Sequence, residues 1–143
     1  MENQLTKKII FVDSNYWIYL FDKTTPEHEV VREHFQKIYS DSNIVANTVV
    51  MMEVMHYLVK RLGPEIAQQK WELFRAIPYE IGDLMHVELD SVFQMLKTYS
   101  FTGIGGRDAT ILSYMKSKGI TEIATHDEAF AHVDFVTVVD PIK

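Results

Sequence analysis

Four acidic residues in this sequence have the type and the local setting to support chemistry. They are Asp13, Glu53, Asp108 and Asp127. Carboxylate oxygens are hard ligands, so a cluster of them favours Mg²⁺ or Mn²⁺ over softer metals. Two such ions about 3.5–4 Å apart can activate water and stabilise the leaving oxygen of a phosphodiester. This chemistry is open to the chain only if its fold brings the four acids together.

Asp13 comes directly after an unbroken apolar run. That run predicts a strand over residues 8–12 that is buried on both faces, as in a parallel sheet. Asp13 then falls at the carboxyl end of the strand, which is where ligands gather in open α/β sheets. The alternative is that Asp13 or Asn15 simply caps the short helix expected over residues 15–21.

Glu53 lies in a segment that is nearly apolar all round, a helix expected from Val49 to Leu62. Such a helix is mostly buried, and a carboxylate in apolar surroundings is costly unless it is paired or metal-bound. This favours a functional role for Glu53. The alternative is that Glu53 marks a narrow solvent-facing stripe together with His56 and Lys60, three and seven residues further on.

Asp108 follows Gly105-Gly106-Arg107 and begins an apolar helix that is expected to end at Lys118. The helix dipole stabilises an acid in the first turn, which explains Asp108 without any function. The two glycines add a second interpretation, because they allow the backbone to come close to a neighbour or a ligand.

Asp127 lies just after a strand expected at residues 122–124. Thr125 and Glu128 have the spacing of a capping box, so both have a sufficient structural explanation. Asp127 is not needed for that box. It is expected to project at the carboxyl edge of the sheet, the same edge to which Asp13 is assigned.

Short strands alternate with longer helices along the rest of the chain. Further strands are expected at residues 44–46, 77–81, 122–124 and 135–139, and Pro78 interrupts the second of these. Helices are expected over residues 26–39, 49–62, 65–76, 84–99, 107–118 and 125–131. This alternation predicts an α/β fold with a mostly parallel sheet and helices on both faces.

Capping and turn residues mark several boundaries. Thr25 is expected to cap the helix that Pro26 opens. Residues 40–43 are polar and predict a break before the second strand. Asn47 or Thr48 is the expected cap of the following helix.

Composition limits the possible classes of protein. The 143 residues are expected to form one domain, 1–143, and the absence of cysteine excludes disulfides and thiolate metal sites. No apolar run approaches the roughly 18 residues of a membrane span, and no signal peptide is recognisable, so we expect a cytoplasmic protein. The formal charge of −6 argues against broad electrostatic binding of nucleic acid, but not against a nuclease whose acids are concentrated in one metal-binding pocket.

The acids lie in four short motifs: Phe11-Val12-Asp13-Ser14-Asn15, Glu53 in its apolar helix, Gly106-Arg107-Asp108-Ala109, and Thr125-His126-Asp127-Glu128-Ala129-Phe130. In order and spacing, over essentially the whole chain, they resemble the four acidic motifs of PIN-domain ribonucleases. The resemblance is greatest to the small VapC-type toxins of toxin–antitoxin pairs. No single motif is specific, and it is the ordered set that carries the resemblance.

The resemblance implies a three-layer α/β/α sandwich with a mostly parallel sheet of about five strands. It also implies endonucleolytic cleavage of RNA by water that Mg²⁺ or Mn²⁺ activates. The metal ligands or organisers would be Asp13, Glu53, Asp108 and Asp127, and the accessory positions Asn15 and Thr125. The expected partners are an RNA substrate, a small antitoxin protein and a second copy of the chain.

Contacts to the substrate are left to a few basic residues because the chain is acidic. Arg107 and Lys116 are the candidates. Two alternative functions stay open. One is a stand-alone PIN nuclease in RNA processing. The other is a receiver-like signalling module, which needs an aspartate after a central strand and a lysine after a late one; Asp13 follows the first strand, and no lysine follows Ala124 in the loop.

Overall fold

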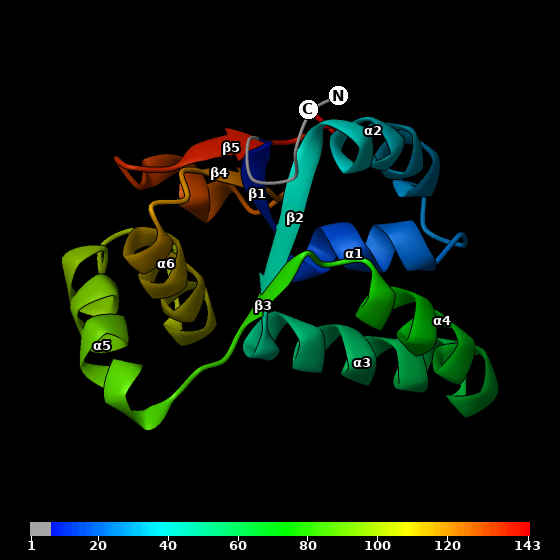
Figure 1. Ribbon diagram of the computed structural model, residues 1–143, viewed down its shortest axis with the longest axis horizontal. Helices are drawn as coiled ribbons and strands as arrows, with labels where there is room; N and C mark the ends of the chain where they lie inside the picture. The colour runs from blue at the N-terminus through cyan, green and yellow to red at the C-terminus, as the bar shows by residue number, and fades with distance from the viewer. Residues whose placement is uncertain (1–6) are drawn as a thin grey trace.

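The computed structural model describes residues 7–143, which form a twisted sheet between two groups of helices (Figure 1). The five strands are β1 Lys8–Val12, β2 Ser42–Asn47, β3 Glu80–Gly82, β4 Glu122–Ala124 and β5 Thr137–Val139. They are all parallel, in the order β3-β2-β1-β4-β5. The first strand of the chain is therefore the central strand of the sheet.

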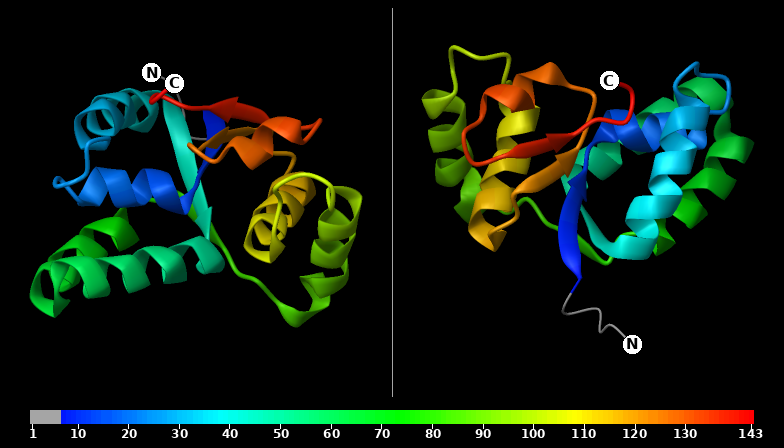
Figure 2. Two further views of the ribbon diagram at one scale, coloured as in Figure 1. Left: turned by 180° about the vertical axis from the view of Figure 1, so that it is seen from behind. Right: turned by 90° about the horizontal axis from the view of Figure 1, so that it is seen from above.

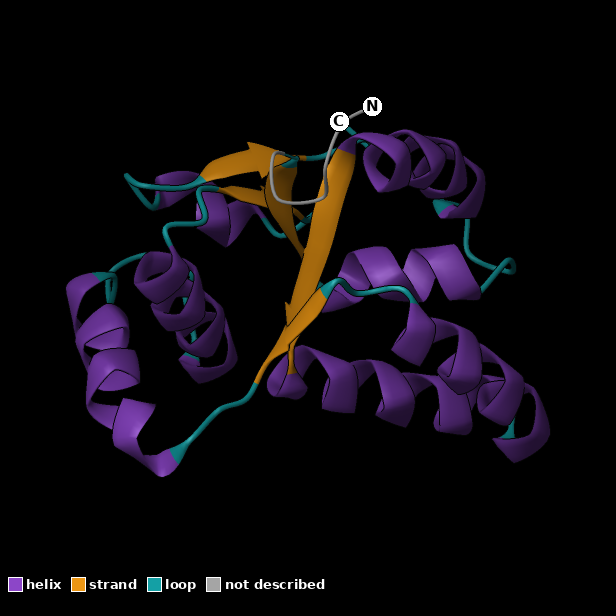
Figure 3. Ribbon diagram, viewed as in Figure 1, coloured by secondary structure: helices purple, strands orange, loops and turns teal. Residues whose placement is uncertain are grey.

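Helices cover both faces of the sheet. They are α1 Ser14–Phe21, α2 His28–Asp41, α3 Thr48–Leu62, α4 Pro64–Ala76, α5 Leu89–Thr98 and α6 Gly106–Lys118, with 3₁₀ turns η2 His86–Glu88 and η3 Glu128–His132. Helices α1 to α4 lie on one side and α5 and α6 on the other (Figure 3), and the views from behind and from above agree (Figure 2). The predicted three-layer α/β/α sandwich is confirmed.

The core fixes the two helices that begin at the site. On one face, Trp17 of α1 stacks on Phe21 and lies 4.6 Å, between ring centroids, from Phe74 of α4. Its indole N–H donates to the carbonyl of Val12 at 2.9 Å, which ties α1 to the end of β1. On the other face, α6 buries Leu112 and its neighbours completely. Both helices are held by large apolar contacts, which are the main source of their stability.

The register of the sheet places the ends of two strands side by side. Val12 of β1 pairs with Ala124 of β4, so the next residues, Asp13 and Thr125, are neighbours across the sheet. The backbone N–H of Asp13 donates to the carbonyl of Ala124 at 3.0 Å. Residues 111 positions apart in the sequence are thereby brought to one edge, the edge at which ligands bind in parallel α/β sheets.

Two predicted boundaries are wrong at the start of the chain. Helix α2 begins at His28 and not at Pro26, because the Thr25 hydroxyl donates to the carbonyl of Asp22 and does not cap a helix. The polar residues 40–43 do not form a break: α2 continues to Asp41, and β2 begins at Ser42, which pairs with Lys8 of β1. Pairing with the central strand here outweighs the low strand preference of polar residues.

Other boundaries differ less. The helix expected over residues 84–99 is split into η2 and α5, and the one expected over 125–131 is the 3₁₀ turn η3. Asn47 is the cap of α3, since its side chain accepts the N–H of Val50 at 2.8 Å. Within residues 7–143, no helix is long and apolar enough to cross a membrane.

Candidate active site

The four acids surround the guanidinium of one residue, Arg107. Its Nη1 lies 2.8 Å from Asp13 Oδ1 and 3.2 Å from Glu53 Oε1. Its Nη2 lies 2.5 Å from Asp108 Oδ1 and 3.8 Å from Asp127 Oδ2. Carboxylates from a strand end, two helices and a loop therefore reach the same small volume, as their positions in the sequence predict.

Asp13 is completely buried and held on both oxygens. Its Oδ1 accepts the N–H of Ser14 at 2.7 Å, which makes Asp13 the cap of α1, and also accepts from Arg107. Its Oδ2 accepts the hydroxyl of Thr125 at 2.8 Å. The alternatives raised by the sequence for Asp13 are compatible, because one carboxylate both caps the helix and faces the acid cluster.

Thr125 and Asn15 join the ends of β1 and β4. The Thr125 oxygen accepts from the Asn15 amide and from the Asp127 N–H, each at 3.0 Å. The Asn15 carbonyl oxygen accepts the N–H of His126 at 3.0 Å. The predicted accessory residues thus hold Asp13 and Asp127 in fixed positions relative to each other.

The capping box predicted for residues 125–128 is wrong. Asp127 itself caps η3, since its Oδ1 accepts the N–H of Ala129 at 3.0 Å. Thr125 is turned inward to Asp13, and Glu128 pairs with Lys143 at the surface. The cap and the cluster share the Asp127 carboxylate, whose other oxygen faces Arg107.

Asp108 lies in the first turn of α6, and its Oδ2 accepts the N–H of Gly105 at 3.1 Å. Burial raises the pKa of Asp108 above its ordinary value, although the bond from Gly105 opposes the rise. A Cβ at Gly105 or Gly106 would meet nothing within 4 Å, so packing of the side-chain position does not require glycine at either residue. The close approach of a ligand to these glycines stays a prediction.

Glu53 combines a buried oxygen with an exposed flank. Its side chain is 40% exposed, but its Oε1 is buried and has no hydrogen-bond partner in spite of the nearby Arg107 charge. Burial raises the pKa of Glu53; Arg107 opposes this rise, and Asp13 adds to it. Glu53 is therefore both a member of the cluster and part of an exposed face, which it shares with His56 and Lys60.

The donor set fits a hard divalent cation. All four residues offer carboxylate oxygens, and one buried oxygen, Glu53 Oε1, lacks a hydrogen-bond partner. Within residues 7–143, however, no three acidic or histidine side chains converge closely enough to hold one ion. The Arg107 guanidinium lies where they would meet.

The sequence profile of the PIN domain matches residues 10–136 of the chain. The chain belongs to the PIN-domain family. No curated protein matches it.

Solved structures resemble this PIN domain over nearly its whole length. The toxin VapC20 of Mycobacterium tuberculosis, described as cleaving the Sarcin-Ricin loop, has a TM-score of 0.75 at 20% identity over 89% of this chain and 96% of its own. DNA-bound VapBC of Salmonella typhimurium gives 0.73 at 20% identity over 95% and 99%. A toxin-antitoxin complex from Klebsiella pneumoniae gives 0.67 at 17% identity over 92% and 97%. At these identities the likeness shows the fold.

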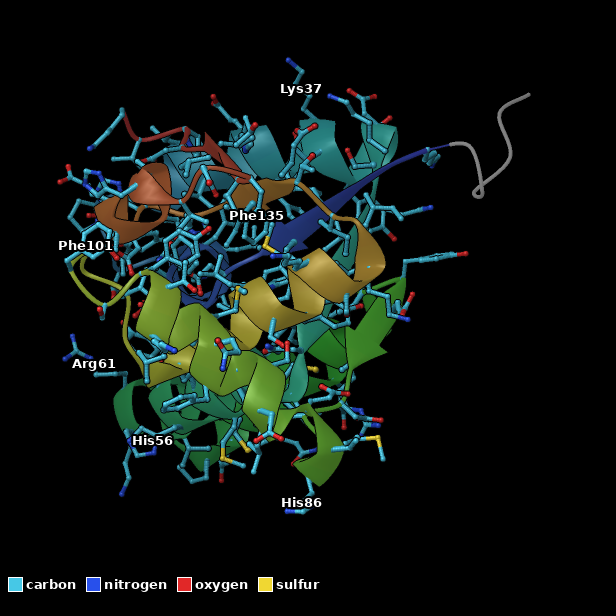
Figure 4. The ribbon with its side chains drawn as sticks, turned by 90° about the vertical axis from the view of Figure 1, so that its left-hand side faces the viewer. Lys37, His56, Arg61, His86, Phe101 and Phe135 are labelled. Atoms are coloured by element: carbon cyan, nitrogen blue, oxygen red, sulfur yellow. The ribbon has the colours of Figure 1, made fainter. Side chains whose placement is uncertain are left out.

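A groove of about 860 Å³ opens beside the acids of the PIN domain. It runs along α3, and its walls are mostly apolar, with Val49 and Met52 of α3 facing Ile18 of α1. Glu53 is one of its lining residues, and Lys60 and Arg61 line it further along the helix. His56 and Arg61 project at the same margin of the molecule (Figure 4).

The two basic residues proposed for substrate contact lie in different places. Arg107 is at the centre of the acid cluster. Lys116 is near the other end of α6, with its Nζ 5.9 Å from the centroid of the Phe135 ring, and the structure does not bring it to the acids. The sequence placed Arg107 next to Asp108 but carried no signal that one guanidinium reaches all four carboxylates.

Proposed function

We propose that this PIN domain is a metal-dependent endoribonuclease and the toxin of a toxin–antitoxin pair. The observation that supports this most strongly is the meeting of Asp13, Glu53, Asp108 and Asp127 at the carboxyl edge of a parallel sheet. Four carboxylates around one small volume repel one another unless protons or cations neutralise their charge. In a PIN domain, this arrangement is best explained as a site for Mg²⁺ or Mn²⁺.

The acidic residues have different roles in this proposal. Asp13, Asp108 and Asp127 would hold the cation, and each is fixed by a backbone N–H that its carboxylate accepts. When bound, the cation would activate water and stabilise the charge that develops on a phosphodiester. Fixed ligands place these charges before the reaction begins, which is the usual source of such catalysis.

Glu53 has a different role in this proposal. Its buried Oε1 lacks a hydrogen-bond partner, and its raised pKa favours the uptake of a proton. It also lines the groove along α3, from which a substrate would reach it. We assign to Glu53 Oε1 the acceptance of the proton from the attacking water.

The proposed antitoxin has a suitable surface on this chain. The groove along α3 has apolar walls and opens beside Glu53, so a segment of a small partner protein bound there would block access to the acids. Two of the similar structures are complexes described as VapBC or toxin-antitoxin, which supports a partner of this kind.

The receiver-like alternative has one argument in its favour. Asp13 does follow the central strand of the sheet, which the chain order alone does not indicate. The residue after β4 is Thr125, however, and its hydroxyl is already bound to Asp13. A receiver-like module needs a lysine at this position, and the residue there is Thr125. The nuclease is therefore the better interpretation.

The decisive experiment is cleavage of RNA by the purified chain with Mn²⁺ or Mg²⁺. We expect cleavage that EDTA abolishes and that Asp108→Asn lowers by at least about 100-fold, since a neutral amide is a poor ligand for a hard cation. Asp134→Asn is the matched control, because Asp134 accepts from Tyr99 at the exposed surface, away from the four acids. Cleavage that survives EDTA, or equal activity in both variants, would contradict the proposal.

A further inference from the structure

Arg107 makes a set of contacts that a surface arginine does not make. Its guanidinium lies within 2.8 Å of both Asp13 Oδ1 and Asp108 Oδ1, and Glu53 and Asp127 lie on either side. The side chain is 27% exposed, so it is largely withdrawn from water. Burial opposes its charge, but Asp13 and Asp108 outweigh burial and raise the pKa of Arg107.

The contacts of Arg107 have the geometry of strong, charge-assisted bonds. The guanidinium N–H groups bind the same carboxylate oxygens that would coordinate a metal ion. A carboxylate oxygen bound to a guanidinium N–H is less available to a cation. In the described part of the chain, no three acidic or histidine side chains lie close enough together to hold one ion, and the guanidinium lies between the four acids. The guanidinium and a divalent cation therefore cannot both occupy the centre of the cluster.

We propose that Arg107 is a built-in competitor of the divalent cation. In the metal-free protein the guanidinium takes the cation's place and neutralises part of the charge of the four carboxylates. A cation that binds must displace it from Asp13 and Asp108. This inference rests on the proposed metal-dependent function, and it predicts that the protein stays folded without metal and binds metal less tightly than four carboxylates alone would.

Isothermal titration with MnCl₂ tests the competition without relying on activity. We expect Arg107→Met to bind Mn²⁺ at least about tenfold more tightly than the unmodified chain. Without metal, the same variant should unfold at a lower temperature, because the carboxylates lose their counter-ion. Arg32→Met is the matched control: Arg32 pairs with Glu29 on the exposed face of α2, so Mn²⁺ binding should not change.

Arg107→Lys separates displacement from simple charge repulsion. Lysine keeps the positive charge, but its compact ammonium cannot match a planar fork that reaches several carboxylates at once. Displacement predicts that Arg107→Lys also binds Mn²⁺ more tightly than the unmodified chain. This variant retains a counter-ion, so it also serves if Arg107→Met does not fold without metal.

Three results would overturn the inference. Equal or weaker Mn²⁺ binding by Arg107→Met, while the unmodified chain binds, would remove the competition and leave the proposed nuclease intact. Tighter binding by Arg107→Met with unchanged binding by Arg107→Lys would reduce the effect to charge repulsion. No Mn²⁺ binding by any of the proteins would overturn both the inference and the proposed metal-dependent function.

Discussion

Thr125 joins the ends of β1 and β4 within the candidate site. It is completely buried; its hydroxyl donates to Asp13 and its oxygen accepts from Asn15 and from the N–H of Asp127. A hydroxyl has one hydrogen to donate and two lone pairs to accept, so Thr125 uses its full capacity. It lies behind the acids and acts by positioning them.

Thr125→Val tests this positioning role. Valine has nearly the same shape but leaves the Asp127 N–H without its side-chain acceptor and removes one of the two acceptors of the Asn15 amide, which should lower the free energy of unfolding by about 1–3 kcal/mol. Cleavage of RNA should fall by about 10–100-fold, the usual cost of losing a group that orients metal ligands. Urea unfolding and a cleavage assay measure the two effects.

Thr121→Val is the matched control, since Thr121 is exposed at the start of the same strand region. Its effect on stability should stay within about 0.5 kcal/mol. Equal losses in both variants would show that the Thr125 hydroxyl has no special role.

The sequence predicted which residues form the candidate site better than it predicted the contacts between them. The four acids could be chosen because each has a definite place at a strand end or in a helix. The contact of Arg107 with Asp13 spans 94 residues and that of Thr125 with Asp13 spans 112, and no local pattern encodes such pairings. The spacing of Thr125 and Glu128 predicts a local capping box, which does not form because the Thr125 hydroxyl bonds to Asp13.

At the scale of elements, the fit of α6 against the sheet depends on Gly82 at the end of β3. A Cβ on Gly82 would lie 2.3 Å from Cε1 of Tyr114, well inside contact distance. Tyr114 is buried and packs edge-on against Phe11 of the central strand, with 6.0 Å between ring centroids. The ring therefore has little room to move away, and α6 relies on this contact.

Gly82→Ala should lower the free energy of unfolding by about 1–3 kcal/mol, the usual cost of adding atoms to a packed interior. Gly106→Ala is the matched control because a Cβ there meets nothing within 4 Å, and we expect it to be neutral or slightly stabilising. Thermal unfolding of the metal-free proteins measures both. A neutral Gly82→Ala variant would show that Tyr114 can move and that α6 does not depend on this contact.

Periodicity located most elements, and it failed where tertiary contacts decide the boundary. The strand predicted over residues 8–12 from the apolar run Ile9–Val12 has the limits of β1. The polar residues Ser42 and Asn43 belong to β2 because they pair with the central strand, which their own preferences do not indicate. A hydrogen bond within a turn, at Thr25, likewise moved the start of α2.

At the scale of the whole molecule, the alternation of strands and helices predicted the α/β class but not the strand order. Pairing between distant strands places β1 at the centre, between β2 and β4. This order puts Asp13 beside Thr125 and gathers the acids on one edge. The predicted homodimer stays a prediction, and the exposed apolar residues of η2 and α5, such as Val87 and Phe93, are candidates for its interface.

The acids make the molecule negative overall, and the site concentrates this charge. Four of the 20 acidic residues of the chain lie around one guanidinium. An acidic chain of this kind attracts divalent cations to the cluster more readily than it attracts RNA to its surface. Lys60 and Arg61 are the basic residues that line the groove beside the cluster.

The most direct test of the account is a crystal structure grown with Mn²⁺ and measured at the manganese absorption edge. The account predicts an anomalous peak bonded to carboxylate oxygens of Asp13 and Asp108, with the guanidinium of Arg107 turned away from both. A cluster without such a peak, in which Arg107 still binds Asp13 and Asp108 at high Mn²⁺ concentration, would contradict it.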